Sequence, residues 1–354
     1  MSLSDFSIKS RFGDYQVQFS DSLHACLAQA QSKGGVFFLV DQKVHRLYSK
    51  DFATLERPVI TWEATEENKT YQALERVFDL LMDAGFKKNS RLVVVGGGIL
   101  QDVGGFVAST LYRGVGWDLI PTTLLAQADS CIGAKTSVNL TRAKNLIGTF
   151  YPPQNVYLTP SVLGTLEPGD VRSGLCEAVK LAMLDAADHV EWMRPRLRAA
   201  LDLNGVNEFL HRALLIKKRY IEEDEFDRGV RNLLNYGHTF AHAFEAVTNF
   251  AIPHGVAVGL GMEAAVYFSE RLGFVDSKHA DNVRGFLDPL VTAAKPGLQS
   301  HTAAEFVRVM KSDKKNTSSD ITFILSRGYG EMFKHPLPAS QAEQILGGYL
   351  QDFV

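Results

Sequence analysis

The chain has 354 residues, of which 45% are hydrophobic, so it can bury a large core and exceeds the size at which a single core keeps growing. Its formal net charge of −3 gives no basic surplus for nucleic acid, and no apolar run approaches the roughly 18 residues of a membrane span. The N-terminal segment lacks the apolar core of a secretion signal, and the three cysteines show no CxxC spacing. We therefore expect a two-domain cytoplasmic protein that binds neither nucleic acid nor membranes.

The first part of the chain alternates between strand-like and helical patterns. Apolar runs typical of strands occupy residues 35–42, 57–62, 90–98 and 117–123, and a helical pattern occupies residues 69–85. The alternation continues to about residue 160 and is typical of a parallel α/β sheet.

After residue 170, long helical patterns dominate. They occupy residues 173–186, 206–224, 239–247 and 256–273, and residues 321–330 are a late strand candidate. We predict an α/β domain over residues 1–162, followed by a mainly α-helical domain over residues 163–354.

A run of three glycines, residues 96–98, ends the third strand-like segment, directly after four apolar residues. Glycine permits close approach of the backbone, so amide N–H groups at the start of the next helix could bind a pyrophosphate. A tight turn without a ligand is the alternative. Asp41 ends the first apolar run and could accept a hydrogen bond from a ribose, although such aspartates more often form turns. Glu66 and Lys69 could similarly be no more than charges near a helix start.

Charged side chains lie among apolar neighbours over residues 111–153. Asp129 and Lys135 flank the small, apolar segment SCIGA, where burying either charge without a partner would be costly. A single lysine or arginine is usually a surface residue. Together, however, the cations of the chain could line a site for a doubly charged phosphate. These cations are Arg113, Lys135, Lys144, Lys180, Lys217, Arg231, Lys314 and Lys315.

Three histidines, His238, His242 and His254, fall within one short stretch. His238 and His242 are one helical turn apart, so in a helix both imidazoles leave the same face and could bind a divalent metal. Two histidines that share this spacing by chance are the alternative. His254 lies between proline and glycine, and Glu177 is an isolated acidic residue within an apolar segment. A carboxylate with imidazoles would suit zinc.

Seven segments of the chain form a recognisable series: GGGILQDVGGFVASTLYRG (96–114), PTTLLAQADSCIGAKT (121–136), KNLIGTFYPP (144–153), SGLCEAVK (173–180), RNLLNYGHTFAHAFEA (231–246), HGVAVGLGM (254–262) and SDKK (312–315). In their order and spacing these segments resemble the 3-dehydroquinate synthase family, within the wider group of sugar phosphate cyclases. The resemblance implies an N-terminal Rossmann-like domain that binds NAD, a helical C-terminal domain that binds zinc, and a homodimer.

The resemblance also implies roles for individual residues. Glu177, His238 and His254 become the zinc ligands in place of the His238–His242 pair, and His242 becomes a proton-transfer residue that contacts the phosphate. Residues that would bind NAD are Asp41, Glu66, Lys69, Gly97, Gly98, Asp102, Thr122, Thr123, Lys144 and Thr165. Residues that would hold substrate are Arg113, Asp129, Lys135, Asn145, Lys180, Lys217, Arg231, Asn235, His242 and Lys315. The residues with implied catalytic roles are His242, Asn235, Lys180, Lys135, Arg231, Asp129 and Asp227. The partner subunit's Arg113 would reach the phosphate.

The implied substrate is a phosphorylated sugar acid, 3-deoxy-D-arabino-heptulosonate 7-phosphate, and the implied product is 3-dehydroquinate of the shikimate pathway. Zinc, which cobalt could replace, would lower the pKa of a substrate hydroxyl so that NAD could remove hydride from the adjacent carbon. The new ketone would acidify the neighbouring C–H for phosphate elimination. Hydride return, ring opening and an intramolecular aldol addition would follow, so that NAD is regained.

Departures from the family pattern leave alternatives open. Gln101 and Ala134 stand where the family commonly has glycine, and Asp227 stands where glutamate is usual. A related cyclase that acts on another sugar phosphate in a secondary pathway is the first alternative. Such cyclases tend to differ at the counterparts of Lys217, Arg231 and Asn235, and this chain keeps all three. A metal-dependent alcohol or glycerol dehydrogenase shares the domain plan but typically binds metal through an aspartate and histidines. A non-catalytic binding protein is the third alternative.

Overall fold

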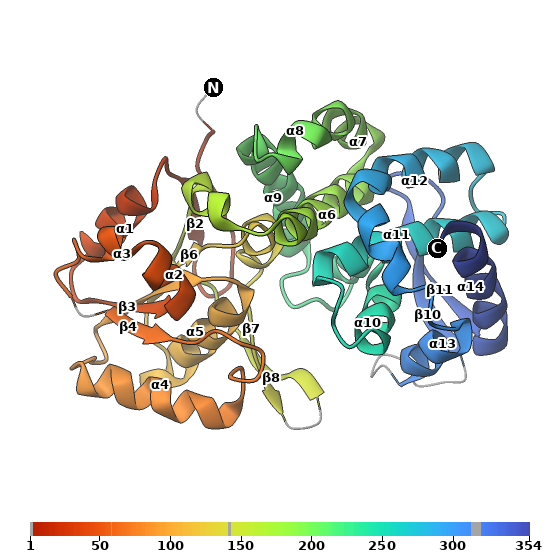
Figure 1. The fold of residues 1–354 in the computed structure, drawn as a ribbon. Coiled ribbons are helices and arrows are strands. Elements are labelled where there is room, and N and C mark those ends of the chain that lie inside the picture. The colour runs from red at the N-terminus through yellow and green to blue at the C-terminus, as the bar shows by residue number, and fades with distance from the viewer. Residues whose placement is uncertain (1–2, 58, 141–142, 313–319) are drawn as a thin grey trace. The chain divides into compact units, whose positions relative to one another are not determined.

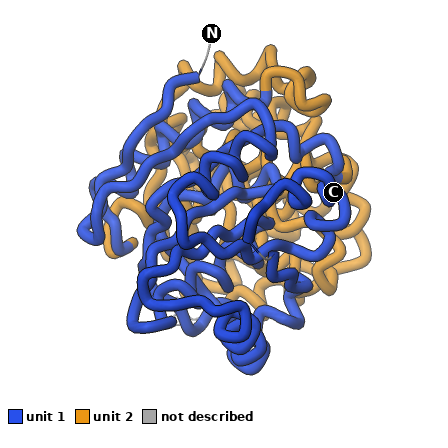
Figure 2. The backbone as a smooth tube through the Cα atoms, turned by 90° about the vertical axis from the view of Figure 1, so that its left-hand side faces the viewer, with its two compact units in different colours: residues 1–166, 206–226 blue, residues 167–205, 227–354 orange. Residues whose placement is uncertain are grey.

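A computed structural model describes residues 3–57, 59–140, 143–312 and 320–354 (Figure 1). The chain divides into two compact units, coloured in Figure 2: unit 1 comprises residues 1–166 and 206–226, and unit 2 comprises residues 167–205 and 227–354. Residues 206–226 thus belong to unit 1, whereas a single boundary after residue 162 would assign them to the second domain. The domain limits 1–162 and 163–354 stay a prediction. Within the described ranges, no helix has the length and apolar character needed to cross a bilayer.

Unit 1 is built on a seven-stranded sheet. Its strands lie in the order β1 (Phe6–Ile8), β2 (Tyr15–Phe19), β9 (Asn155–Leu158), β6 (Trp117–Pro121), β5 (Arg91–Gly96), β3 (Val36–Asp41) and β4 (Val59–Trp62). β1 and β2 pair antiparallel, and every other neighbouring pair of this sheet is parallel. The parallel sheet predicted from the alternating pattern is therefore confirmed, and the four predicted strands are β3, β4, β5 and β6.

The helices of unit 1 include the one predicted over residues 69–85. This helix, α4 (Tyr71–Asp83), begins after Thr70, whose side chain caps it, and it buries Leu74, Val77 and Leu81 at helical spacing. The other elements of the unit are α1 (Leu23–Gln31), α2 (Gln42–Leu47), α3 (Ser49–Phe52), α5 (Gly98–Thr110), η1 (Leu111–Arg113), η2 (Ala126–Ser130), η3 (Pro160–Thr165), α9 (Val206–Glu223), and a hairpin of β7 (Lys135–Leu140) and β8 (Ala143–Phe150).

Close packing holds the start of α5 at the end of β5. The strand residues from Leu92 to Gly96 are all buried, as expected for a parallel strand covered on both faces. A Cβ on Gly104 would lie 2.4 Å from Cγ2 of Val94, so glycine is required where the helix crosses the strand. The three-glycine turn therefore has a fixed position at the carboxyl edge of the sheet.

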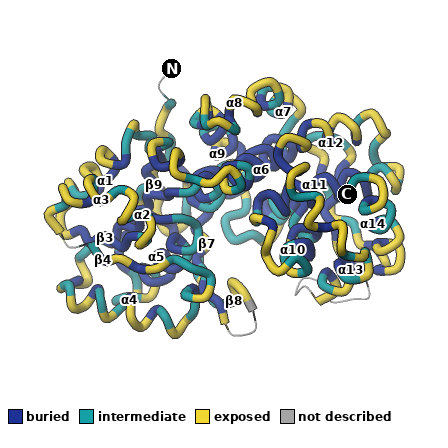
Figure 3. The backbone as a smooth tube through the Cα atoms, in the orientation of Figure 1, coloured by how far each residue is buried: buried dark blue, intermediate teal, exposed yellow. Residues whose placement is uncertain are grey.

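Unit 2 is mainly helical, as predicted, with one small antiparallel sheet. Its elements are α6 (Pro168–Asp185), α7 (Ala187–Met193), η4 (Arg194–Arg196), α8 (Leu197–Leu201), η5 (Val230–Asn235), α10 (His238–Val247), α11 (His254–Arg271), α12 (Ser277–Val291), η6 (Thr292–Gly297), α13 (Ala303–Lys311), β10 (Asp320–Ser326), β11 (Met332–Pro338) and α14 (Ala339–Phe353). α6 is buried along most of its length (Figure 3).

The central helix of unit 2 is α11, in which every residue from Gly255 to Ser269 is buried. A helix buried on all sides is surrounded by others, and the chain at the start of α10 approaches it closely at a pair of glycines. Gly237 has a left-handed φ of 81°, and a Cβ on Gly261 would lie 2.1 Å from the Gly237 carbonyl oxygen. This contact places the first turn of α10 directly against α11.

Candidate functional site

Three side chains of unit 2 form a group that could hold a metal ion. Nε2 of His238 and Nε2 of His254 each lie 3.8 Å from Oε1 of Glu177, and one ligand atom from each residue lies within 4.8 Å of the others. Zinc bound tetrahedrally at about 2.0–2.1 Å requires ligand atoms roughly 3.3 Å apart, so each imidazole would have to move about 0.5 Å closer to the Glu177 oxygen. A carboxylate with two imidazoles fits zinc and leaves a fourth position for a substrate oxygen.

Each of these side chains comes from a different helix. Glu177 is buried on α6, and His238 and His254 are the first residues of α10 and α11. The left-handed Gly237 precedes His238, and Pro253 precedes His254, so both histidines follow a residue that ends the preceding loop sharply. The group therefore depends on the packing of three helices and not on a local sequence motif.

The two histidines differ in their pKa. Burial lowers the pKa of His238 well below its ordinary value, and the charges of Lys180 and the other histidines lower it further. Burial also lowers the pKa of His254, but the hydrogen bond and charge of Glu245, with the charge of Glu177, raise it above its ordinary value. His238 is therefore neutral at neutral pH, which is the form that binds a metal.

His242 lies beside the group but outside it. Its ring centroid is 5.7 Å from that of His238 and 6.3 Å from that of His254. Among the described residues, the ligand group consists of Glu177, His238 and His254. His242 leaves the same helix as His238, but the atoms close enough to share one ion in the described part of the chain come from the other three side chains, as the family resemblance implied.

Five of the predicted nucleotide residues lie along one edge of the unit 1 sheet. β3, β5 and β6 are neighbouring parallel strands, so their carboxyl ends share an edge. Directly at or after these ends lie Asp41, Gly97, Gly98, Thr122 and Thr123. A Cβ on Gly97 would lie 2.9 Å from Cγ2 of Thr123, so any larger residue here would require the Thr123 side chain to move. The first N–H groups of α5 at this edge suit an anionic ligand.

Asp41 has a structural role in addition to any ligand contact. Its Oδ1 accepts hydrogen bonds from the Lys43 N–H at 2.7 Å and the Val44 N–H at 3.3 Å, and so caps α2. The structure therefore shows Asp41 in the turn-forming role that was the alternative to a ribose contact. Thr165, another predicted nucleotide residue, lies 3.2 Å from the Tyr48 hydroxyl.

Lys69 joins several predicted residues into one cluster in unit 1. Its Nζ lies 2.6 Å from Oδ2 of Asp102 and 2.6 Å from Oδ1 of Asn145. Ser137 Oγ lies 2.9 Å from the same two oxygens. Burial raises the pKa of Asp102, while the charge of Lys69 opposes this. Lys69 is buried and is therefore not an exposed charge at a helix start.

Glu66 and Lys144 extend this cluster. The Asn139 amide donates to Oε1 of Glu66 at 2.8 Å, and Lys144 Nζ lies 3.8 Å from the same oxygen. The cluster thus contains the predicted nucleotide residues Glu66, Lys69, Asp102 and Lys144. It also contains Asn145, which the resemblance assigns to the substrate.

A second charged pair in unit 1 connects α9 to η2. Lys217 Nζ lies 3.0 Å from Oδ1 of Asp129 and also donates to the Asp129 backbone carbonyl. η2 is a π-helical turn, a form that often occurs at functional sites. Lys217 is buried, so its contact with Asp129 fixes the relative positions of these two predicted substrate residues. Arg113 and Lys135 are exposed in the same unit.

The remaining predicted substrate residues belong to unit 2. Lys180 lies one turn after Glu177 on α6 and contacts its carboxylate, and Arg231 is buried on η5. Asn235 ends η5, where its amide donates to the Asn232 carbonyl at 3.0 Å. The Asn232 amide in turn donates to Oδ1 of Asp227 at 2.9 Å. Lys314 and Lys315 lie outside the described residues.

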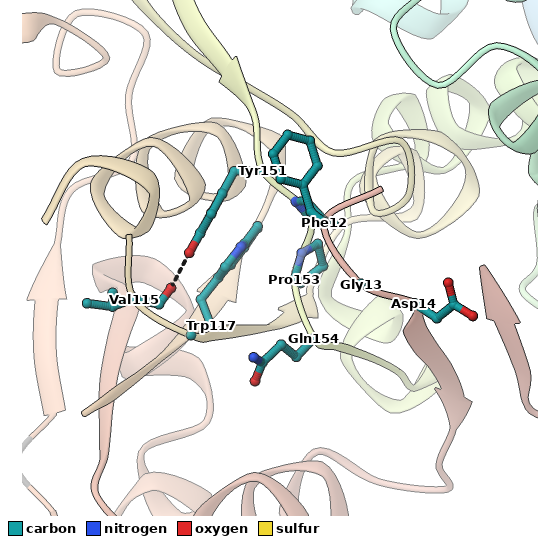
Figure 4. A pocket seen from close by; sticks show the side chains of 10 residues that line it. Phe12, Gly13, Asp14, Val115, Trp117, Tyr151, Pro153 and Gln154 are labelled. Carbon is teal, nitrogen blue, oxygen red and sulfur yellow. Dashed lines mark hydrogen bonds between the residues drawn. The ribbon is translucent and has the colours of Figure 1, made fainter. Parts of the chain in front are cut away.

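A separate pocket in unit 1 has a volume of about 140 Å³ (Figure 4). Its walls include Phe12, Trp117, Pro153 and Tyr151, whose hydroxyl donates to the Val115 carbonyl at 3.0 Å. None of the residues that line this pocket is a predicted site residue, so it is not part of the candidate site.

Sequence reasoning missed polar residues that support the predicted ones. Glu245 contacts His254, and Asn139 and Asn232 contact Glu66 and Asp227. Only Glu245 had a signal in the sequence, because it follows His238 by seven residues and so returns to the same face of one helix. Gln101, which stands where the family commonly has glycine, is buried. Its amide donates a hydrogen bond to the backbone carbonyl of Ser130, next to Asp129, and its amide oxygen accepts one from the Ser130 hydroxyl.

Known proteins resemble this chain over most of its length. Residues 59–173 match the 3-dehydroquinate synthase N-terminal family, and residues 174–316 match the 3-dehydroquinate synthase C-terminal family. The chain is 33% identical to a 3-dehydroquinate synthase of Thermoanaerobacter sp. (strain X514), over 84% of this chain and 85% of that protein. It is 36% identical to one of Rhodospirillum rubrum, over 86% of this chain and 83% of that protein. A crystal structure of 2-deoxy-scyllo-inosose synthase with carbaglucose-6-phosphate, NAD+ and Co2+ has the same fold, with a TM-score of 0.87, 22% identity, and coverage of 98% of this chain and 100% of that chain.

Proposed function

The chain belongs to the 3-dehydroquinate synthase family, and we propose that it converts 3-deoxy-D-arabino-heptulosonate 7-phosphate to 3-dehydroquinate and phosphate. The observation that carries this proposal is the convergence of Glu177, His238 and His254 on one point in a chain with this family membership. A carboxylate and two imidazoles around an open position are the ligands expected of a catalytic zinc site.

Zinc would be held by Glu177, His238 and His254, and cobalt is an alternative ion because a solved structure of the same fold contains Co2+. The bound ion would lower the pKa of a substrate hydroxyl and orient it. Lys180 balances the charge of Glu177 within the buried part of α6. His242 is exposed beside the group, where it would contact the phosphate and transfer a proton.

NAD would lie along the carboxyl edge of the unit 1 sheet. Its pyrophosphate would bind the N–H groups that begin α5 after Gly97, and the Lys69 cluster would contact the rest of the nucleotide. NAD supplies a hydride acceptor that is restored within the same turnover. The residues proposed for this role are Asp41, Glu66, Lys69, Gly97, Gly98, Asp102, Thr122, Thr123, Lys144 and Thr165.

The residues proposed to hold substrate are cations, amides and carboxylates, some in unit 1 and some in unit 2. Asp129 and Lys217 would offer a fixed acid–base pair, and Arg231 would offer a buried cation for a carboxylate or phosphate. Proposed with them are Lys135, Asn145, Lys180, Asn235, Asp227, His242 and Lys315. We also propose a cytoplasmic homodimer in which Arg113 of the partner subunit completes the phosphate site.

Substrate identity is tested by measuring phosphate release from purified protein with zinc and NAD. We expect release from 3-deoxy-D-arabino-heptulosonate 7-phosphate and little from a hexose 6-phosphate, which lacks the carboxylate. His254→Ala should lose both bound zinc and phosphate release, whereas the control His279→Ala, on α12, should retain both. Release from the hexose 6-phosphate alone would assign the chain to a different cyclase reaction.

A further inference from the structure

The carboxylate of Glu245 is directed at the imidazole of His254. Oε1 of Glu245 lies 3.1 Å from Nδ1 of His254, and the Glu245 side chain is only 12% exposed. Glu245 lies on α10, seven residues after His238, so both side chains leave the same face of the helix. A mostly buried carboxylate requires a partner, and here the partner is His254.

The two nitrogens of His254 face different carboxylates. Nδ1 faces Glu245, whereas Nε2 lies 3.8 Å from Oε1 of Glu177. A neutral imidazole carries one N–H, and a carboxylate that accepts this hydrogen from Nδ1 leaves the lone pair on Nε2. The arrangement therefore selects the tautomer in which Nε2 can bind an ion.

The other histidine of the group is held differently. Nδ1 of His238 lies 3.3 Å from the backbone carbonyl of Tyr236, and the His238 side chain is 14% exposed. The His254 side chain is 36% exposed, so the surrounding residues confine its ring less than they confine that of His238. A charged acceptor at Nδ1 supplies the orientation that burial supplies at His238.

Glu245 does not fit the role of a ligand to the same ion. Its carboxylate lies on the Nδ1 side of the His254 ring, opposite the nitrogen that faces Glu177. The atoms close enough to share one ion in the described part of the chain come from Glu177, His238 and His254. Its contact with the site is therefore through the imidazole.

We propose that Glu245 is a positioning residue, which holds His254 in the tautomer and orientation that bind the metal. The inference rests on the proposed metal site and extends it to a residue that does not touch the ion. Such partners of ligating histidines typically change metal affinity by about 10- to 100-fold when they are removed.

The test compares zinc affinity among Glu245→Ala, Glu245→Gln and a control, Glu270→Gln. Glu270 is also a carboxylate of unit 2, but it pairs with Arg284 at 3.1 Å. Zinc affinity is measured by competition with a coloured chelator, and the absorption spectrum of bound Co2+ reports the ligand geometry. Circular dichroism of each metal-free variant checks its fold.

We expect Glu245→Ala to weaken zinc binding by about 10- to 100-fold and to alter the cobalt spectrum. Glu245→Gln should retain more affinity, because its amide oxygen can still accept from Nδ1–H. Glu270→Gln should match the wild type. If the wild type binds zinc and releases phosphate while Glu245→Ala keeps its zinc affinity and cobalt spectrum, the inference on Glu245 is wrong and the proposed function stands. If the wild type binds no zinc, both are wrong.

Discussion

Lys180 lies one helical turn after Glu177 on α6, and its ammonium contacts Oε2 of the carboxylate whose Oε1 faces both histidines. Both side chains are 2% exposed, so the pair is buried. Each oxygen of Glu177 thus has a different function: one is directed at a cation of the protein, and the other is available to a metal ion.

Replacing Lys180 should destabilise the metal-free protein. Lys180→Met leaves Glu177 as a buried charge without its cation, and breaking a buried ion pair in this way typically costs about 3–5 kcal/mol. The free energy of unfolding, measured with urea in the presence of a chelator, should fall by that amount. Added zinc should reduce the loss, because the ion also neutralises Glu177.

The matched control for this prediction is Lys218→Met. Lys218 pairs with Glu222 at 3.0 Å, with side chains that are 26% and 22% exposed, so its loss should cost less than about 1 kcal/mol. Equal stability of Lys180→Met and the wild type without metal would contradict the importance of the buried pair.

Removing the carboxylate of Asp102 should weaken NAD binding. Asp102→Asn disrupts the cluster built on Lys69 at the carboxyl edge of the sheet, and we expect a loss of at least about tenfold in affinity, or roughly 1.4 kcal/mol. NAD affinity is measured by calorimetry, and zinc affinity should not change.

Asp118 provides a control for that measurement in the same sheet. It is buried beside Arg91 at 2.9 Å, but it is the second residue of β6 and so lies toward the amino end of the strand. Asp118→Asn should lower stability and leave NAD affinity as in the wild type. Equal NAD affinities of the two variants would show that the nucleotide does not bind at the predicted edge.

Lys217→Met should impair substrate turnover without affecting either cofactor. Lys217 holds Asp129 by its carboxylate and its backbone carbonyl, so its loss releases the η2 turn. We expect kcat/KM to fall by about 100-fold, which corresponds to roughly 2.7 kcal/mol. The neighbouring variant Lys218→Met should have wild-type kinetics. Normal turnover by Lys217→Met would show that the Lys217–Asp129 pair is not part of the substrate site.

Glu222 should make the stability of the protein depend on pH. Partial burial raises the pKa of Glu222, but the Lys9 N–H and the Lys218 ammonium lower it more, so the net pKa lies below its ordinary value. A depressed folded pKa stabilises the protein above the unfolded pKa, and this contribution disappears as pH falls through the folded pKa.

The change Glu222→Gln should therefore cost about 0.5–1 kcal/mol of unfolding free energy at neutral pH. Denaturant melts over a series of acidic pH values should show the difference from the wild type shrinking toward zero. A difference that stays constant with pH would mean that the carboxylate charge contributes nothing.

Much of the fold follows from local sequence patterns. The apolar runs that became β3, β4, β5 and β6 and the helical pattern that became α4 were predictable because alternation and helical spacing are short-range properties. The helix predicted over residues 206–224 is confirmed as α9. Its membership of unit 1, however, was not predicted. An amphipathic pattern shows that one face is buried and does not show against which element.

The group of candidate metal ligands shows the same limit of local sequence patterns. Spacing alone suggested His238 with His242, whereas the structure groups His238 with His254 and with Glu177 from α6. The resemblance to a family supplied this set, because three ligands on three helices share no sequence period. Supporting contacts such as Glu245 to His254 depend on tertiary packing and were not predicted.

The most direct test of the account follows phosphate and NADH in one reaction of the zinc-loaded protein with NAD and 3-deoxy-D-arabino-heptulosonate 7-phosphate. We expect phosphate to appear in proportion to substrate consumed while the NADH absorbance stays flat, because the hydride returns within each turnover. NADH that accumulates in step with product would contradict the account and identify a net dehydrogenase.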